Sequence, residues 1–310
     1  MKISNALMVC AAMLACWSIP RSAQAEIKTA ELDYKQGATV LQGFVAWDDA
    51  VKGKRPGVLV VHEWWGHNEH AREQARRLAK AGYVGFALDM YGKGKVAAHP
   101  NDAKTFMTEA TADFKVEKAR FDAALAQLKK RPEVNPKQIA AIGYCFGGAV
   151  VLDMVRVGEP LTAVATFHGA LATKQPAKKG IKPRILVMTG ADDPMVPKEQ
   201  VDAFKSEMTA AGARYEVIEY PGAKHAFTNP EADKHGMPGI AYNAKADQES
   251  WASLLTFLND VWPPKPGMGT LQAAAPAPAA QPGPKAPAQA APKAQPAQAA
   301  PKAAPAKPAP

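Results

Sequence analysis

The chain has 310 residues, a formal net charge of +9 and 27 prolines. Much of the charge lies at the ends, because residues 263–310 hold five lysines and no acidic residue and residues 1–25 hold two basic residues. The segment between them carries a net charge of only +2, which excludes a strongly basic nucleic-acid-binding domain as the source of the high charge.

Residues 1–25 have the pattern of a secretory signal peptide. Lys2 precedes a mostly apolar run over residues 6–19, and Ala23-Gln24-Ala25 matches a small-x-small cleavage site. The apolar run is too short for a comfortable membrane span. We therefore expect an exported protein, periplasmic or secreted, whose mature chain begins at Glu26.

Cleavage at this site would leave one cysteine, Cys145, because Cys10 and Cys16 belong to the predicted signal. A chain with one cysteine cannot form an internal disulfide, and a lone thiol in an oxidising compartment is a liability unless it is buried or used. Lipoprotein processing at Cys16 is a weaker alternative, because Met13 is an unusual lead residue for that motif.

Residues 263–310 consist mainly of Pro, Ala, Gln and Lys, with almost nothing large and apolar. Such a composition cannot bury enough surface to offset the entropy of ordering, so it predicts a disordered, partly polyproline-II tail. The tail lysines favour weak contact with an anionic envelope surface.

Residues 26–262 alternate between predicted strands and helices, which is typical of one α/β domain with a mostly parallel sheet. A hairpin over residues 31–47 comes first. Strands are predicted at 57–62, 83–88, 138–142, 161–167, 185–189 and 215–220. Helices are predicted at 68–81, at 101–130 in two pieces, and at 149–157, 197–212 and 246–261. Function in such sheets lies at the carboxyl ends of the strands, so the residues that follow each strand are the candidates.

The segment Gly143-Tyr144-Cys145-Phe146-Gly147-Gly148 joins a predicted strand to the next helix. Its G-x-C-x-G spacing matches the nucleophile elbow, usually G-x-S-x-G, with sulfur in place of oxygen. Only small side chains fit two residues before and after a nucleophile in so strained a turn. The helix N-terminus would favour a thiolate. The alternative is a small buried cysteine before a glycine-rich turn.

An acid and a histidine follow two later strands, in the chain order of α/β-hydrolases. Cys145 would attack a carbonyl carbon, and His225 would transfer the proton. Asp193 would orient the imidazole; we favour it over Asp192 because it fits a G-x-x-D spacing from Gly190.

The oxyanion hole needs two backbone N–H donors. In elbow enzymes one belongs to the residue after the nucleophile, here Phe146, and the other to a loop after an earlier strand, here Trp64. The remaining histidines lack the spacing of a metal site, and we predict no cofactor.

Several motifs together resemble the dienelactone hydrolase family of α/β-hydrolases. They are His62-Glu63-Trp64-Trp65-Gly66, Asp89-Met90-Tyr91-Gly92, the elbow, Phe167-His168-Gly169, Gly190-Ala191-Asp192-Asp193 and His225-Ala226-Phe227. The resemblance covers nearly all of residues 26–262 and implies an α/β-hydrolase fold, a Cys145-His225-Asp193 triad and a small ester or lactone substrate. It also implies that Glu63 holds the resting thiol until substrate displaces it, which lets the cysteine and histidine form an ion pair.

One position departs from the family pattern. Dienelactone hydrolase holds its substrate's carboxylate with arginines, one of them four residues after the catalytic histidine, where this chain has Asn229. We therefore expect ester or lactone hydrolysis but not dienelactone as substrate, and a pocket formed by Trp64, Trp65, Phe227 and Asn229.

Two other functions fit the same residues. One is a non-catalytic, envelope-associated binding protein on a hydrolase scaffold, and the other is a different hydrolytic specificity, such as peptide or carbon–halogen cleavage.

Overall fold

The computed structural model describes residues 26–173 and 175–263. The predicted signal peptide at 1–25, and all but the first residue of the predicted tail at 263–310, lie outside the described residues, so both remain predictions. No helix of the described part is long and apolar enough to cross a membrane.

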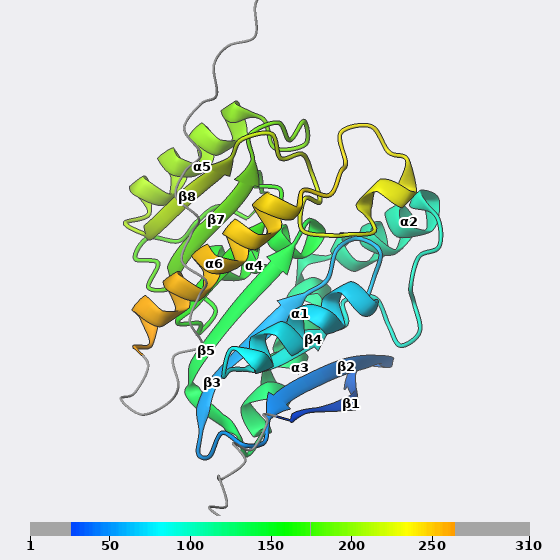
Figure 1. The fold of residues 1–310 in the computed structure, drawn as a ribbon, viewed down its shortest axis with the longest axis vertical. Coiled ribbons are helices and arrows are strands. Elements are labelled where there is room, and N and C mark those ends of the chain that lie inside the picture. The colour runs from blue at the N-terminus through cyan, green and yellow to red at the C-terminus, as the bar shows by residue number, and fades with distance from the viewer. Residues whose placement is uncertain (1–25, 174, 264–310) are drawn as a thin grey trace, which may run out of the picture. The chain divides into compact units, whose positions relative to one another are not determined.

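A sheet of eight strands forms the centre of the domain, in the order β1-β2-β4-β3-β5-β6-β7-β8 (Figure 1). The strands are β1 Ile27–Gln36, β2 Thr39–Asp48, β3 Arg55–Val61, β4 Val84–Leu88, β5 Val134–Tyr144, β6 Ala163–Phe167, β7 Arg184–Gly190 and β8 Arg214–Tyr220. β2 pairs antiparallel with β1 and β4, and every pair from β4 to β8 is parallel. The predicted α/β-hydrolase fold and mostly parallel sheet are confirmed, although the hairpin begins earlier, at Ile27.

Six α-helices and one short 3₁₀ helix are present in the described chain. They are α1 Glu69–Lys80, α2 Pro100–Thr111, α3 Phe114–Lys130, α4 Phe146–Val157, α5 Lys198–Ala210, α6 Ala244–Val261 and the 3₁₀ helix η1 Ala232–His235. The helical segment predicted at 101–130 is in two pieces, because the Asp113 side chain accepts a hydrogen bond from the Lys115 N–H and starts a new helix. No predicted element corresponds to η1.

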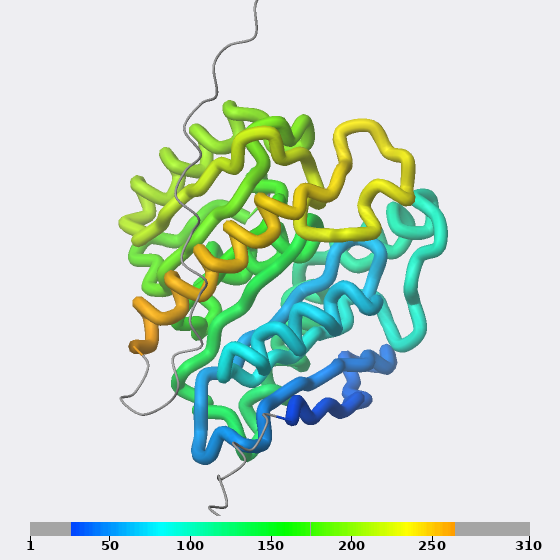
Figure 2. The backbone as a smooth tube through the Cα atoms, in the orientation of Figure 1, coloured from blue at the N-terminus to red at the C-terminus, as the bar shows by residue number. Residues whose placement is uncertain are grey.

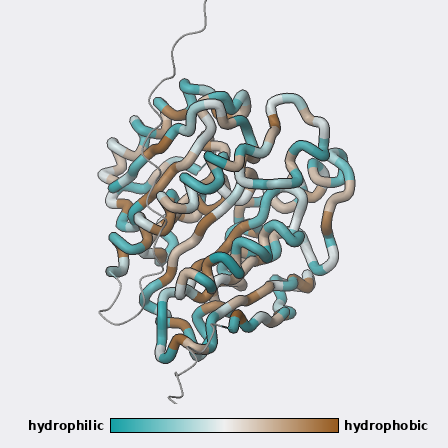
Figure 3. The backbone as a smooth tube through the Cα atoms, viewed as in Figure 1, coloured by the Kyte–Doolittle hydropathy of each residue, from teal (hydrophilic) through white to brown (hydrophobic). Residues whose placement is uncertain are grey.

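The helices divide between the two faces of the sheet (Figure 1). Residues of α1 and α6 share one buried cluster, and those of α3, α4 and α5 share the other. β3 contributes side chains to both clusters: Val58 and Val60 belong to the first, and Leu59 and Val61 belong to the second. This alternation explains why the strand is apolar at every position, since both of its faces are covered. In Figure 3 the central strands are correspondingly brown, between helices with teal segments.

Long loops follow the strands at their carboxyl ends. The segment from β8 to α6, yellow in Figure 2, includes η1 and lies beside α2. Trp65 after β3, Ala103 of α2 and Met237 after η1 belong to one apolar cluster, which confirms that these loops meet. The candidate residues named above therefore share one edge of the sheet.

Candidate active site

Cys145 occupies the turn between β5 and α4. Its φ is 51° and its ψ is −114°, a left-handed conformation that costs a non-glycine residue about 1–3 kcal/mol. The Cys145 N–H donates to the Phe167 carbonyl at 3.0 Å, which ties the turn to the end of β6. The strained elbow predicted from the G-x-C-x-G spacing is present.

The glycines around Cys145 have no room for a side chain. A Cβ on Gly143 would lie 2.0 Å from the Gly147 carbonyl oxygen, and one on Gly147 would lie 2.3 Å from the Val61 carbonyl oxygen. A Cβ on Gly148 would lie 2.2 Å from Thr166 Oγ1. A side chain at any of these glycines would therefore collide with another part of the elbow or with the residues at the ends of β3 and β6.

Three side chains from separate loops meet at this edge of the sheet. His225 Nε2 lies 3.1 Å from Cys145 Sγ, and His225 Nδ1 lies 2.8 Å from Asp193 Oδ2. The second Asp193 oxygen accepts the Met195 N–H at 2.8 Å. Asp193 and His225 are buried, whereas Asp192 is exposed. The geometry is that of a Cys-His-Asp triad, with the acid that the spacing favoured.

The backbone of His225 is held by a segment that follows it in the chain. The His225 N–H donates to the Gly239 carbonyl at 3.1 Å, and the Ala241 N–H donates to the His225 carbonyl at 3.1 Å. Ala226 has a φ of 57°, so the chain turns sharply after the histidine. The loop between η1 and α6 thus positions the imidazole, a contribution that no local motif indicated.

The electrostatics of the triad favour a charged imidazole. Burial alone would lower the pKa of His225, but the negative charge of Cys145 and hydrogen bonds to Asp193 and Cys145 together raise it to about 10. The ring is therefore an imidazolium at neutral pH when the thiolate is present, which is the reactive ion pair of a cysteine hydrolase.

Glu63 follows β3 and is almost fully buried. Its Oε2 accepts the Asn229 Nδ2–H at 2.6 Å and lies 3.8 Å from His70 Nδ1. Its Oε1 has no hydrogen-bond partner among the described residues. Here the thiol pairs with His225, and Glu63 pairs with Asn229.

The residues predicted to line the pocket have different environments. Trp64 is half-buried, and Trp65 stacks on the His235 ring with the ring centroids 3.8 Å apart. Asn229 is buried and occupied by Glu63. Phe227 has no exposed surface and packs in the core beneath α6, so the prediction that it lines the pocket does not agree with its position. Its aromatic character reflects core packing.

The two predicted oxyanion donors, Trp64 and Phe146, follow the carboxyl ends of the neighbouring strands β3 and β5. β3 and β5 pair in parallel with Val61 opposite Gly143, and Trp64 and Phe146 each follow that pair by three residues. Within the described chain, neither backbone N–H has a hydrogen-bond acceptor. Both groups are therefore available to a ligand at this edge.

Two histidines, one beside the triad and one beside Glu63, were not among the predicted site residues. His168 Nε2 lies 2.8 Å from Thr228 Oγ1, and its ring stands edge-on to His225 with the centroids 5.2 Å apart. His70 lies beside Glu63. The Phe167-His168-Gly169 motif could have indicated His168. His70 lies on the predicted amphipathic helix, where no motif indicated a role in the site. No three metal-binding side chains gather anywhere in residues 26–173 and 175–263.

We predict that Asn229→Asp destabilises the protein more at pH 8 than at pH 5. It places a second carboxylate against buried Glu63, which raises the pKa of the pair, so stability is lost as the pH rises. Urea unfolding at pH 8 should show a loss of about 3–5 kcal/mol. The control Asn229→Ala adds no charge but removes the hydrogen bond to Glu63 and the one that Asn229 Oδ1 accepts from the Glu231 N–H, and should cost about 1–3 kcal/mol at both pH values. Equal losses for Asn229→Asp at the two pH values would contradict the paired arrangement.

Comparison with known proteins places this geometry in a family. Residues 41–262 match the dienelactone hydrolase family. An Aquifex aeolicus protein named "Putative carboxymethylenebutenolidase" is 28% identical over 231 residues, which cover 73% of this chain and 96% of the relative. A solved dienelactone hydrolase-like promiscuous phosphotriesterase from metagenomic libraries is 38% identical, with a TM-score of 0.73, and the match covers 77% of this chain and 99% of that chain.

A more distant structure shows how widely the fold extends. An α/β-hydrolase enzyme from a deep-sea metagenome library is 18% identical with a TM-score of 0.58, over 76% of this chain and 98% of that chain. The family match spans the strands and loops that carry the cysteine, acid and histidine. This chain therefore belongs to the dienelactone hydrolase family.

Proposed function

We propose that the protein is an exported hydrolase that cleaves a small ester or lactone through Cys145, His225 and Asp193. The contact of 3.1 Å between Cys145 Sγ and His225 Nε2 carries the proposal. A thiol that packed into the apolar interior away from a base would have favoured a scaffold without catalysis. Here the base is within reach, and a buried carboxylate orients it.

The mechanism follows from the positions of these groups. The Cys145 thiolate attacks the carbonyl carbon, and the N–H groups of Phe146 and Trp64 stabilise the oxyanion. The imidazolium of His225 gives its proton to the leaving alkoxide, which departs as an alcohol and leaves a thioester on Cys145. His225 then takes a proton from water, the hydroxide attacks the thioester, and the acid leaves as the thiol is restored.

Glu63 is proposed to guard the thiol. In this arrangement Glu63 holds a neutral resting thiol in the absence of substrate, and it turns to Asn229 when Cys145 pairs with His225. The contacts described above, Glu63 with Asn229 and Cys145 with His225, correspond to the second state.

The substrate is proposed to lack the carboxylate of dienelactone, because Asn229 stands where the family's arginine lies and is itself bonded to Glu63. A second activity, hydrolysis of phosphotriesters, is favoured by the 38% identity to a promiscuous phosphotriesterase. The release of p-nitrophenol from p-nitrophenyl acetate and from a dialkyl p-nitrophenyl phosphate, measured with purified protein, distinguishes ester hydrolysis from phosphotriester hydrolysis.

We predict that Cys145→Ala lowers kcat/KM for p-nitrophenyl acetate by at least about a thousandfold, because the nucleophile is removed. Far-UV circular dichroism should be unchanged, since alanine fills the same turn. The neighbouring aspartates provide a matched pair: Asp193→Asn should lose most of the activity, while the exposed Asp192→Asn should retain it. Turnover that survives Cys145→Ala would contradict Cys145 as the nucleophile, whereas a wild type without turnover would favour the non-catalytic binding protein.

In the state in which Cys145 pairs with His225, we predict that the imidazole stays protonated to about pH 10, and that it titrates at a lower pH in Cys145→Ala, which lacks the thiolate. Nitrogen-15 NMR of the histidine rings follows both titrations. Since the pKa of His225 in the folded state is raised above the usual histidine value of 6.5, the stabilisation is complete below pH 6.5 and is lost as the pH rises through about 10. Identical titration curves would show that the cysteine carries no charge.

Export is proposed from the predicted signal peptide. Expression of the full chain in a Gram-negative host should give a periplasmic or secreted product whose first residue is Glu26. A lipid-modified Cys16 would support the lipoprotein alternative, and an intact N-terminus in the cytoplasm would contradict export.

Weak binding of the tail lysines to anionic vesicles, lost in high salt, would support the proposed envelope contact.

A further inference from the structure

A cavity of about 400 Å³ lies beside the active site. Its walls come from the junction of α2 and α3, from the outer side of α4 and from the loop after β6. Phe146, the residue after the nucleophile, forms part of the wall. The mechanism proposed above uses only the backbone of Phe146 and none of the other residues in this cavity.

Two carboxylates line the cavity and differ in how they are satisfied. Asp153 of α4 accepts hydrogen bonds from Thr173 Oγ1 and from Arg156 Nη1. Glu117 of α3 is only 5% exposed, and within the described residues its side chain has no hydrogen-bond or ion-pair partner. Burial, assisted by the charge of Asp153, raises the pKa of Glu117 to about 7. A carboxylate with little exposure gains free energy from a cationic partner, so Glu117 is a candidate ligand-binding group in the cavity wall.

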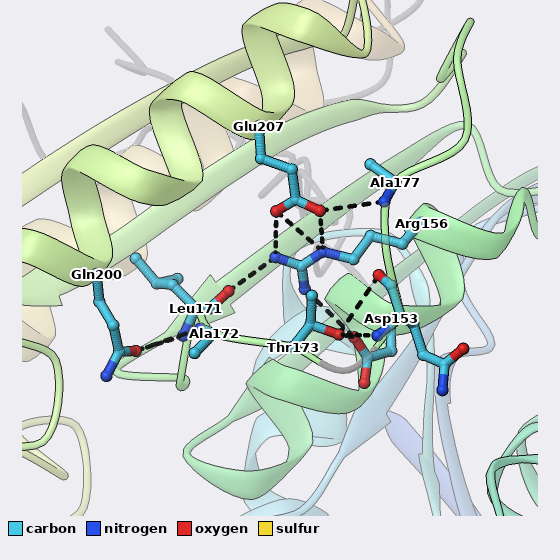
Figure 4. A network of polar contacts seen from close by, with 9 residues as sticks. Asp153, Arg156, Leu171, Ala172, Thr173, Ala177, Gln200 and Glu207 are labelled. Carbon is cyan, nitrogen blue, oxygen red and sulfur yellow. Dashed lines mark hydrogen bonds and ion pairs between the residues drawn. The ribbon is translucent and has the colours of Figure 1, made fainter.

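The charged groups around Glu117 are already committed to other partners. Arg156 donates three hydrogen bonds to Glu207, one to the Leu171 carbonyl at 2.7 Å and one to Asp153, as Figure 4 shows. Lys118, the next residue on α3, pairs with Asp122 and Glu159. Among residues 26–173 and 175–263, no cation therefore pairs with Glu117.

The cavity's shape is held by the same network. Glu207 also accepts the Ala177 N–H at 3.1 Å, and Gln200 accepts the N–H groups of Leu171 and Ala172 (Figure 4). The loop after β6 is thus fixed to α4 and α5 before any ligand arrives. A preformed wall lowers the entropy lost on binding.

The rest of the lining is apolar. Phe114, Phe146, Ala149 and Val150 contribute aromatic and aliphatic surface to the same cavity as Glu117. A ligand that fits would carry an apolar body and a cationic head, because the carboxylate forms a charge-assisted hydrogen bond with an ammonium group.

We propose that this cavity is a binding site for a small organic ammonium compound, whose ammonium group pairs with Glu117 and whose apolar body lies against Phe114 and Phe146. The site is separate from the catalytic triad. Its occupation does not depend on whether Cys145 acts as a nucleophile.

The test is a titration of the full chain at pH 8, where Glu117 is ionised, with 2-phenylethylammonium and with its neutral isostere 2-phenylethanol. NMR shifts of Phe146 and Ala149 report binding. The wild type should bind the ammonium compound at least about tenfold more tightly than the alcohol. Glu117→Gln should remove that preference while p-nitrophenyl acetate turnover is retained.

Asp122→Asn is the matched control, since it neutralises a carboxylate of the same helix that is committed to Lys118. It should keep the preference for the ammonium compound. Equal affinities for the two compounds in the wild type, or a preference that survives Glu117→Gln, would overturn the proposal. Lys174 lies outside the described residues; binding that appears only in Lys174→Gln would assign the cavity to that lysine and also overturn it.

Discussion

The contact between Cys145 Sγ and His225 Nε2 depends on backbone strain at one residue. The turn that gives Cys145 a φ of 51° is possible because Gly143 and Gly147, two residues away on either side, have no side chain where the ends of β3 and β6 lie against it. With any side chain at Gly147, the first turn of α4 would collide with the end of β3. The thiol would then leave the helix N-terminus, and His225 Nε2 would lose its contact with Cys145 Sγ. The packing of the sheet thus provides the free energy that keeps the nucleophile in its strained conformation.

A second requirement is the burial of charge. Asp193, His225 and Glu63 are all nearly inaccessible to solvent, and each charge is accommodated by a neighbour. Burial disfavours charge on the imidazole, yet the thiolate and the carboxylate reverse that effect. The same desolvation that would destabilise an isolated ion strengthens the attraction within the pair.

The two carboxylates outside the triad show how a site can be inferred from what is unpaired. Asp153 belongs to a closed network with Arg156 and Glu207, and its role is structural. Glu117 lies in the same cavity without a partner among the described residues. The contrast between these two acids, rather than the number of acids, supports a cation-binding site.

The sequence by itself determined the strand–helix alternation, the elbow at Cys145 and the choice of Asp193 over Asp192, because each depends on local spacing or on periodic burial. It could not show that Phe227 lies in the core, or that Asn229 bonds Glu63. It also gave no indication that residues Gly239–Ala241 hold His225, or that Glu117 faces a cavity. These facts depend on contacts between segments far apart in the chain. Local side-chain patterns encode which element forms, but only the packed sheet and its loops decide which side chains meet.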